Sequence, residues 1–217
     1  MFYLIGAGGI GCFLAPALSR MVKDPQEICI VDQDTVEKKN LSRQMYTKEH
    51  IGENKALILA MSIASQCDQT WFNEGTMIKP NSVLFCCADN IPCRRDTLMV
   101  ADRTDSVAVI GGNETWSSEA YIYFPKWNGS EYDPRVYYPK LLTVNTGRPD
   151  DPCHSAKTDD ETPQTIMANM TAANFMVRLY FAWTDDRGRL TWRTKKSKPV
   201  HLRAERTILF SALDYKA

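Results

Sequence analysis

Apolar and polar residues alternate in blocks along the first half of the chain. Apolar runs of strand length occupy residues 2–5, 27–31, 82–88 and 107–110. In the segments between them, apolar residues recur at the three- and four-residue spacing of an amphipathic helix. The predicted order is therefore strand, helix, strand, helix, strand, helix, strand. This order favours a doubly wound, Rossmann-like α/β fold with a mostly parallel sheet.

Local signals indicate where the predicted helices begin and end. The first helix contains Pro16, which removes a backbone hydrogen bond and predicts a kink or an early end. The second helix is expected to start near Glu53, with an apolar stripe over residues 56–64. The third is expected to start at Asn90, a typical N-cap residue, with Pro92 in its first turn.

The second half of the chain has a different pattern. Residues 116–145 are rich in Tyr, Trp, Pro and Gly and alternate in the way that predicts antiparallel strands. The polar segment 145–163 predicts a mobile loop, and the long helix after it is expected to end near Trp183. A turn at residues 186–189 then leads into a predicted strand around Trp192. The C-terminal half is thus expected to be antiparallel and rich in aromatic residues.

Composition excludes several classes of partner. The 217 residues carry 26 Lys and Arg against 26 Asp and Glu, so there is no basic excess for nucleic acid or an anionic membrane. No apolar stretch reaches the roughly 18 residues of a membrane span, and the first residues do not resemble a signal peptide. The seven cysteines are odd in number and scattered, which favours free thiols in the reducing cytoplasm.

A glycine-rich turn joins the first predicted strand to the first predicted helix. Gly6, Gly8 and Gly11 form the pattern G-x-G-x-x-G, and Gly9 is a fourth glycine in the same turn. Such a turn lets backbone N–H groups approach a phosphate, although tight strand-helix packing alone also explains it. Asp32 ends the second strand, where a carboxylate accepts hydrogen bonds from ribose hydroxyls. A nucleotide without a ribose 2′-phosphate is the predicted ligand.

Three further motifs follow in a fixed order. Residues 31–44 read V-D-x-D-x-V-x-x-x-N-L-x-R-Q, residues 52–55 read G-x-x-K, and residues 89–94 read D-N-x-x-x-R. This series resembles the ThiF/MoeB/HesA family of ubiquitin-activating-like adenylating enzymes at every fixed position. The resemblance is dense over residues 2–112 and continues more weakly to near residue 180. It implies that ATP and Mg²⁺ are the cofactors.

The resemblance implies a role for each polar residue of these motifs. Joining a carboxylate to the α-phosphate of ATP brings two anions together, and Arg43 and Lys55 would supply positive charge. Asn40 would belong to the same phosphate shell, and Asp89 would hold Mg²⁺ at the end of a buried strand, next to Asn90 in the nucleotide site. The alternative is that Asp89 and Asn90 only cap the next helix and that Arg43 and Lys55 are solvated. The roles of two further motif residues are left open.

Those two residues are Arg94 and Asp34. Arg94 matches the last position of the third motif but equally suits a helix surface, and Asp34 is expected to be structural or at the edge of the phosphate site.

A nucleophile is also suggested by resemblance. Several members of the family pass the acyl group to a cysteine before a long helix, and Cys153 is the cysteine in that region here. Its neighbour His154 would lower the thiol pKa. The spacing to the helix is longer than in the family, so an incidental loop cysteine is the alternative. No Cys-x-x-Cys pair is present, which argues against a structural zinc site.

The sequence therefore predicts one ThiF-like adenylation domain over residues 1–217. Residues 1–112 would bind the nucleotide, and residues 113–217 would bind a small ubiquitin-fold or sulfur-carrier protein, whose C-terminal carboxylate is adenylated. The resemblance also implies a homodimer. An NAD-dependent oxidoreductase is the alternative that the glycine motif and Asp32 allow. A nucleotide-binding scaffold without catalysis is a third, since the chain enters its first strand at residue 2, without the family's N-terminal extension and its arginine.

Overall fold

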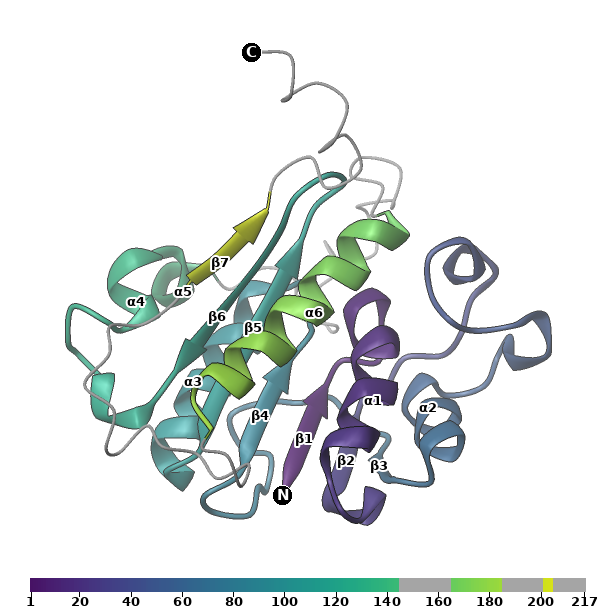
Figure 1. Ribbon diagram of the computed structural model, residues 1–217, viewed down its shortest axis with the longest axis horizontal. Helices are drawn as coiled ribbons and strands as arrows, with labels where there is room; N and C mark the ends of the chain where they lie inside the picture. The colour runs from purple at the N-terminus through teal and green to yellow at the C-terminus, as the bar shows by residue number, and fades with distance from the viewer. Residues whose placement is uncertain (145–164, 185–200, 205–217) are drawn as a thin grey trace.

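A mostly parallel β-sheet runs through the molecule. The computed structural model describes residues 1–144, 165–184 and 201–204. In this part of the chain the sheet has seven strands in the order β3-β2-β1-β4-β5-β6-β7 (Figure 1). Strands β1 to β5 are parallel, whereas β6 is antiparallel to both β5 and β7. The strands are β1 (Phe2–Ile5), β2 (Ile28–Val31), β3 (Gln66–Asp68), β4 (Val83–Cys86), β5 (Val107–Asn113), β6 (Ser118–Tyr123) and β7 (His201–Ala204).

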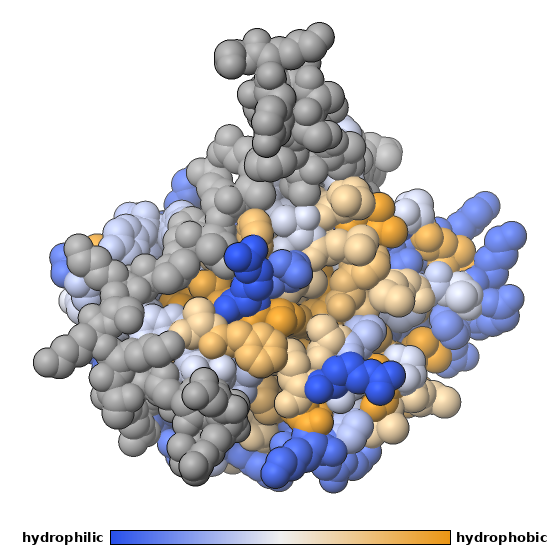
Figure 2. Space-filling view, viewed as in Figure 1, coloured by the Kyte–Doolittle hydropathy of each residue, from blue (hydrophilic) through white to orange (hydrophobic). Residues whose placement is uncertain are grey.

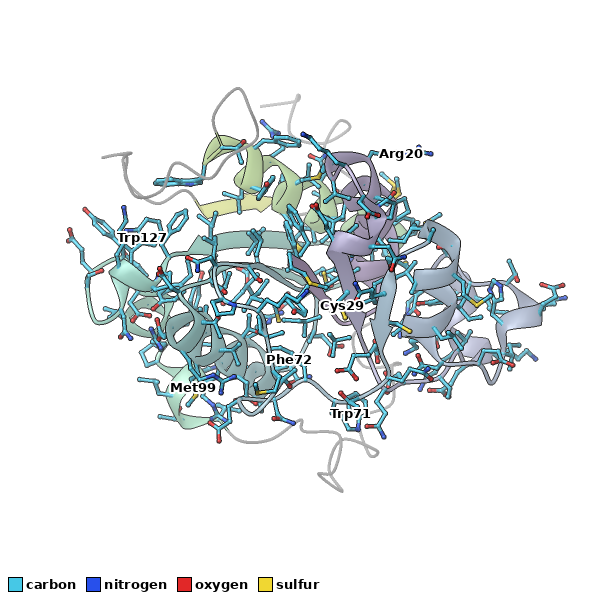
Figure 3. All side chains as sticks on the ribbon, turned by 90° about the horizontal axis from the view of Figure 1, so that it is seen from below. Arg20, Cys29, Trp71, Phe72, Met99 and Trp127 are labelled. Carbon is cyan, nitrogen blue, oxygen red and sulfur yellow. The ribbon has the colours of Figure 1, made fainter. Side chains whose placement is uncertain are left out.

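Helices cover both faces of the sheet. Helices α1 and α6 pack together on one face, and α3 lies on the opposite face (Figures 1 and 3). The α-helices are α1 (Gly9–Met21), α2 (Lys55–Ile63), α3 (Ile91–Thr104), α4 (Pro134–Tyr137), α5 (Lys140–Thr143) and α6 (Ile166–Ala182). Short 3₁₀ helices are η1 (Pro25–Glu27), η2 (Lys38–Ser42), η3 (Lys48–His50) and η4 (Pro125–Trp127). The doubly wound α/β prediction is confirmed.

The core is formed by the central strands and the helix faces that pack on them. Leu4, Ile30, Phe85 and Val109 come from four neighbouring strands and have no exposed surface. Strands buried on both faces are expected to be apolar throughout, which explains the continuous apolar runs of the sequence. From α6, buried side chains include Ala172, Met176 and Leu179.

Apolar side chains also remain on the surface of α6. Ile166, Met167, Met170 and Phe181 are exposed. Apolar colours predominate over this helix in the face shown in Figure 2. Among the described residues, no helix is long and apolar enough to cross a membrane.

A charged network fixes α4 beside the C-terminal part of α3. Arg135 donates from Nη1 to Asp102 Oδ2 at 2.9 Å, from Nε to Asp133 Oδ1 at 2.8 Å and from Nη2 to the Tyr123 hydroxyl at 2.7 Å. The Tyr123 hydroxyl in turn donates to Asp102. The guanidinium-bearing side chain of Arg135 is 13% exposed, so its charges interact in a mostly desolvated setting. This network lies among α3, β6 and α4, on elements other than those of the glycine turn.

Several sequence predictions need correction. The helical spacing up to Met21 is confirmed, but the early end expected at Pro16 is wrong, because buried residues of α1 that include Leu14 and Leu18 hold the helix against the core. The edge strand β3 was not predicted, since its residues Gln66, Cys67 and Asp68 carry no apolar pattern. In the described part of residues 116–145, only β6 is a strand.

The rest of that region contains short helices, α4 and α5 among them. Asp133 caps α4 by accepting a hydrogen bond from the Arg135 backbone N–H, which is a helix-start signal. The predicted loop 145–163, the turn 186–189 and the strand around Trp192 lie outside the described residues.

Candidate nucleotide site

The loops after β1 and β4 meet at the carboxyl end of the sheet. From β1, the chain passes through α1 to β2 on one side, whereas β4 lies on the other side of β1. In open α/β sheets, ligands bind in the crevice at such a reversal of strand order. Gly6 has φ +91°, and a Cβ placed on it would lie 3.2 Å from the Ala88 backbone nitrogen. The glycine turn and the loop after β4 are therefore in contact.

The glycines of the turn differ in how much space surrounds them. A Cβ on Gly11 would lie 2.0 Å from the Gly6 carbonyl oxygen, and one on Gly9 would lie 2.5 Å from the Asn169 side-chain oxygen. At Gly8 the nearest atom would be Gln44 Nε2 at 4.0 Å, so the space there is open. Gly8 is also the N-cap of α1 and provides no side-chain cap. The first N–H groups of α1 are the kind of donors that bind phosphate.

Asp32 directly follows β2 and supports the glycine turn. Its Oδ2 accepts a hydrogen bond from the Ala7 backbone N–H at 2.7 Å, and its Oδ1 accepts one from the Asp34 N–H at 2.8 Å. Burial of the carboxyl group, with the nearby negative charge of Asp34, raises the pKa of Asp32 to about 6. The positive charge of Lys55 and the two N–H donors act in the opposite direction. Each carboxylate oxygen has a second lone pair, which allows ribose hydroxyls to bind as well.

Lys55 is the first residue of α2 and is buried. Only 6% of its surface is exposed, and its Nζ lies 3.0 Å from Asp34 Oδ2. Asn54 caps the helix and donates from Nδ2 to the carbonyl oxygens of Asp32 and Asp34 at 3.0 and 3.2 Å. The start of α2 is thereby joined to the end of β2. The interpretation of Lys55 as a solvated surface charge is wrong.

Tyr46 links the glycine turn to the start of α2 and was not singled out from the sequence. Its buried hydroxyl donates to the Ala7 carbonyl oxygen at 2.6 Å and lies 3.3 Å from the Lys55 carbonyl oxygen. Burial also raises its pKa above the usual range of a tyrosine. A large aromatic residue within the polar stretch between Asp32 and Gly52 is the sequence signal that identifies it.

The turn around η2 positions Arg43 and Gln44. Asn40 is buried, and its Oδ1 accepts a hydrogen bond from the Glu37 N–H at 2.9 Å. The Asn40 carbonyl oxygen then accepts from the backbone N–H groups of Arg43 and Gln44 at 3.2 and 3.0 Å. Gln44 Oε1 is buried and has no hydrogen-bond partner among the described residues. Because the other side-chain atom of this amide lies near Gly8, a ligand in the crevice is able to complete its hydrogen bonding.

The loop after β4 contributes Asp89 and Asn90. Asn90 caps α3, since its Oδ1 accepts from the Cys93 N–H at 2.8 Å. Asp89 is exposed, and Arg94 donates from Nε to the Ala88 carbonyl oxygen at 3.2 Å. Among the described residues, no group of three or more His, Cys, Asp or Glu side chains is arranged to hold a metal ion. A single carboxylate such as Asp89 fits Mg²⁺ that takes its other ligands from phosphates and water.

The structure thus gathers most of the sequence-predicted residues into one region. Hydrogen bonds join the glycine turn to Asp32, Asp32 to Asp34 and Asp34 to Lys55, and Gly6 contacts the loop that carries Asp89. Arg43 is connected to the turn through Asn169 of α6, which touches Gly9. Cys153 lies outside the described residues.

A sequence model of the ThiF family matches residues 2–179. The chain belongs to the ThiF family. This confirms the resemblance predicted from the motifs at the glycine turn, β2, α2 and α3. No curated protein sequence matches this ThiF-family chain.

Solved structures similar to this ThiF-family chain share its fold. E. coli MccB crystallised with AMPCPP and MccA is 15% identical with a TM-score of 0.63, over 96% of this chain and 65% of that chain. E. coli tRNA N6-threonylcarbamoyladenosine dehydratase, TcdA, in complex with ATP is 16% identical with a TM-score of 0.58, over 82% of both chains. In another MccB structure, with MccA-derived ligand, the chain spans 54% of the MccB length at a TM-score of 0.59 and 16% identity.

Proposed function

We propose that this ThiF-family protein binds ATP with Mg²⁺ and adenylates the carboxylate of a substrate. One observation carries the proposal. The open backbone at Gly8, the buried carboxylate of Asp32 and the buried ammonium group of Lys55 are joined by short hydrogen bonds at the crevice of the sheet. These groups suit the phosphates, the ribose and the charge of one nucleotide.

Each residue has a distinct task in the proposed reaction. The N–H groups at the start of α1 bind phosphate oxygens, and Asp32 accepts hydrogen bonds from the ribose. Lys55 supplies a point charge and Arg43 a planar pair of donors for the phosphates. Asp89 would hold Mg²⁺, which neutralises charge on the triphosphate when bound. In the free protein Lys55 is paired with Asp34, so a phosphate competes with that carboxylate for the ammonium group.

The reaction itself needs positioning and charge neutralisation more than proton transfer. An oxygen of the substrate carboxylate attacks the α-phosphorus of ATP, a new P–O bond forms, and the bond to the bridging oxygen of the β-phosphate breaks. Pyrophosphate leaves with the electron pair, and no proton is removed from the nucleophile. A site built from fixed N–H groups and cations therefore supplies the main catalytic requirement.

We propose a small ubiquitin-fold or sulfur-carrier protein as the substrate, presented through its C-terminal carboxylate. Support comes from β6 and the helices after it, where Val136, Tyr137 and Leu142 are exposed apolar side chains. Tyr121 of β6 and Tyr138 stack with ring centroids 6.0 Å apart beside them. Such an apolar surface suits a protein partner better than a small metabolite. MccB, a structural neighbour, was solved with MccA, which is a further reason for this choice.

A binding experiment tests the nucleotide assignment. We expect Mg-ATP to raise the melting temperature of the protein and NAD to leave it unchanged, because a ligand at about 100 times its Kd stabilises by about 2.7 kcal/mol. Lys55→Met is expected to abolish most of the shift. Lys39→Met is the matched control, since Lys39 is an exposed lysine of η2 whose side chain pairs with Glu37. A shift with NAD and none with Mg-ATP would overturn adenylation in favour of the oxidoreductase alternative.

A second experiment tests the substrate and Cys153. With a carrier protein of the proposed class, the wild type is expected to exchange pyrophosphate with ATP. Cys153→Ala is expected to keep this exchange and to lose a thiol-sensitive covalent adduct with the carrier, if Cys153 accepts the acyl group. An adduct that persists in Cys153→Ala assigns the acyl group to another acceptor.

We also propose that the protein is a homodimer. The exposed apolar residues of α6 support a protein interface on this helix. Sedimentation of the wild type is expected to give the mass of two chains, and Met170→Glu, on the exposed side of α6, is expected to shift it to one chain. A wild-type protein that sediments as one chain at high concentration contradicts this proposal.

A further inference from the structure

A single asparagine of α6 lies between the two segments that contact phosphate in the proposed function. Asn169 has no exposed surface and lies 75 residues beyond Arg94, the last residue of the motifs. Its Nδ2 donates to the Arg43 carbonyl oxygen at 3.1 Å, and its Oδ1 accepts from Asn113 Nδ2 at 2.9 Å. Both ends of the amide are therefore hydrogen-bonded to other elements.

The same amide packs directly against the start of α1. A Cβ placed on Gly9 would lie 2.5 Å from Asn169 Oδ1 and 2.6 Å from Nδ2. Gly9 is the first residue of α1, where the phosphate-binding N–H groups begin. The Asn169 amide thus sets the distance between the first turn of α1 and the backbone of Arg43.

Packing alone does not explain an asparagine at this position. The neighbouring buried positions of α6 are Ala172, Ala173 and Met176, and an apolar residue there would avoid the cost of burying an amide. A buried asparagine contributes net stability only when its polar atoms form hydrogen bonds. Here they bind the carbonyl group of Arg43, the residue after η2, and the side chain of Asn113 in β5.

We infer that Asn169 is a positioning residue that holds Arg43 and the start of α1 in the geometry that binds the triphosphate. The inference rests on the proposed nucleotide-binding function and deepens it. Asn169 acts through the Arg43 backbone and the Gly9 turn. The adenosine part of the ligand is bound elsewhere in the site, at Asp32, so the effect of Asn169 is confined to the phosphates.

The test compares two ligands in the full-length protein. Dissociation constants for Mg-ATP and for adenosine are measured by calorimetry in the wild type and in Asn169→Ala. Losing one hydrogen bond and its positioning effect is expected to weaken ATP about tenfold and adenosine less than about twofold. A variant that merely loosens the fold weakens both ligands alike.

Ser118→Ala is the matched control. The buried Ser118 hydroxyl donates to the Ala168 carbonyl oxygen at 2.8 Å, so it also ties α6 to the sheet, but it touches neither Arg43 nor Gly9. We expect this variant to bind both ligands as the wild type does. Asn113→Ala removes the support of Asn169 from the side of β5 and is expected to cause a smaller loss in the same direction, which keeps the test usable if Asn169→Ala fails to fold.

A double-mutant cycle with Arg43→Ala completes the test. Because part of the effect of Asn169 passes through Arg43, the combined loss of ATP affinity in the double variant is expected to be smaller than the sum of the two single losses. Full additivity of the two changes, or equal losses for ATP and adenosine, overturns the inference and leaves the proposed function intact. A wild-type protein that binds no ATP overturns both, so the two failures are distinguishable.

Discussion

The buried carboxyl group of Asp32 makes nucleotide binding sensitive to pH. Burial raises its pKa to about 6, so the group is half protonated near that pH in the free protein. Ribose hydroxyls donate hydrogen bonds best to the ionised carboxylate, and binding therefore favours the charged form. Affinity for a nucleoside is expected to be highest above the pKa and to fall as the pH drops below it.

The size of the effect follows from the pKa. If only the ionised form binds, the apparent Kd rises by the factor 1 + 10^(pKa − pH), which gives about a tenfold loss of affinity between about pH 7 and about pH 5. Near pH 6, binding should also release about half a proton per molecule bound. About half of the free molecules carry a proton on Asp32 at this pH, and that proton must leave before the nucleoside binds. Asp34 and Lys55 are the charged groups that act on the pKa of this carboxyl group, Asp34 raising it and Lys55 lowering it.

Calorimetry with adenosine measures both quantities. Adenosine has no phosphate, so its own ionisation does not contribute over this pH range. Proton release is obtained by repeating the titration in two buffers of different ionisation enthalpy. Asp34→Asn is expected to move the midpoint below pH 6, since it removes a negative charge that raises the Asp32 pKa.

Asp32→Asn is the control and should bind adenosine more weakly and without pH dependence. An adenosine Kd of the wild type that stays constant from about pH 7 to about pH 5 would refute the reasoning, because the expected change is about tenfold.

Two other predictions concern the fold and the glycine turn. Gly8→Ala should fold normally and weaken ATP binding. Gly11→Ala should instead unfold at a much lower urea concentration, because its Cβ would lie 2.0 Å from a carbonyl oxygen. Urea melts and ATP titrations of both variants separate the two roles. Arg135→Leu should destabilise the protein by about 3 to 5 kcal/mol in urea melts, since it leaves the carboxylates of Asp102 and Asp133 without their cationic partner. Its affinity for ATP should be unchanged, and a loss of affinity would contradict the separation of this network from the nucleotide site.

Much of the site was predictable because its residues follow strand ends. Asp32 and Asp89 come directly after apolar runs, Asn90 follows Asp89, and parallel strands bring such positions to one edge of the sheet. The capping role of Asn90 was also predictable from Pro92, because proline suits the first turn of a helix. For these residues, local sequence and sheet geometry are sufficient.

Other features depend on contacts between distant segments. The Lys55 ammonium group pairs with Asp34 across 21 positions, and Asn169 reaches Arg43 across 126 positions. No periodicity encodes such pairs, because they arise only when two elements pack together. The edge strand β3 escaped prediction for a different reason, since a short exposed strand needs no apolar residues.

The place of α6 in the fold has a consequence for synthesis of the protein. Ribosomes make the chain from its N-terminus, so the glycine turn and the motif residues up to Arg94 emerge before α6. The contacts of Gly9 and Arg43 with Asn169 form only after the segment that ends at Ala182 has been translated. Until then, the face of the sheet that α6 covers lacks the apolar side chains of Met176 and Leu179 that pack on it in the folded protein. A nascent chain therefore acquires its nucleotide site late, in the same step that closes its core.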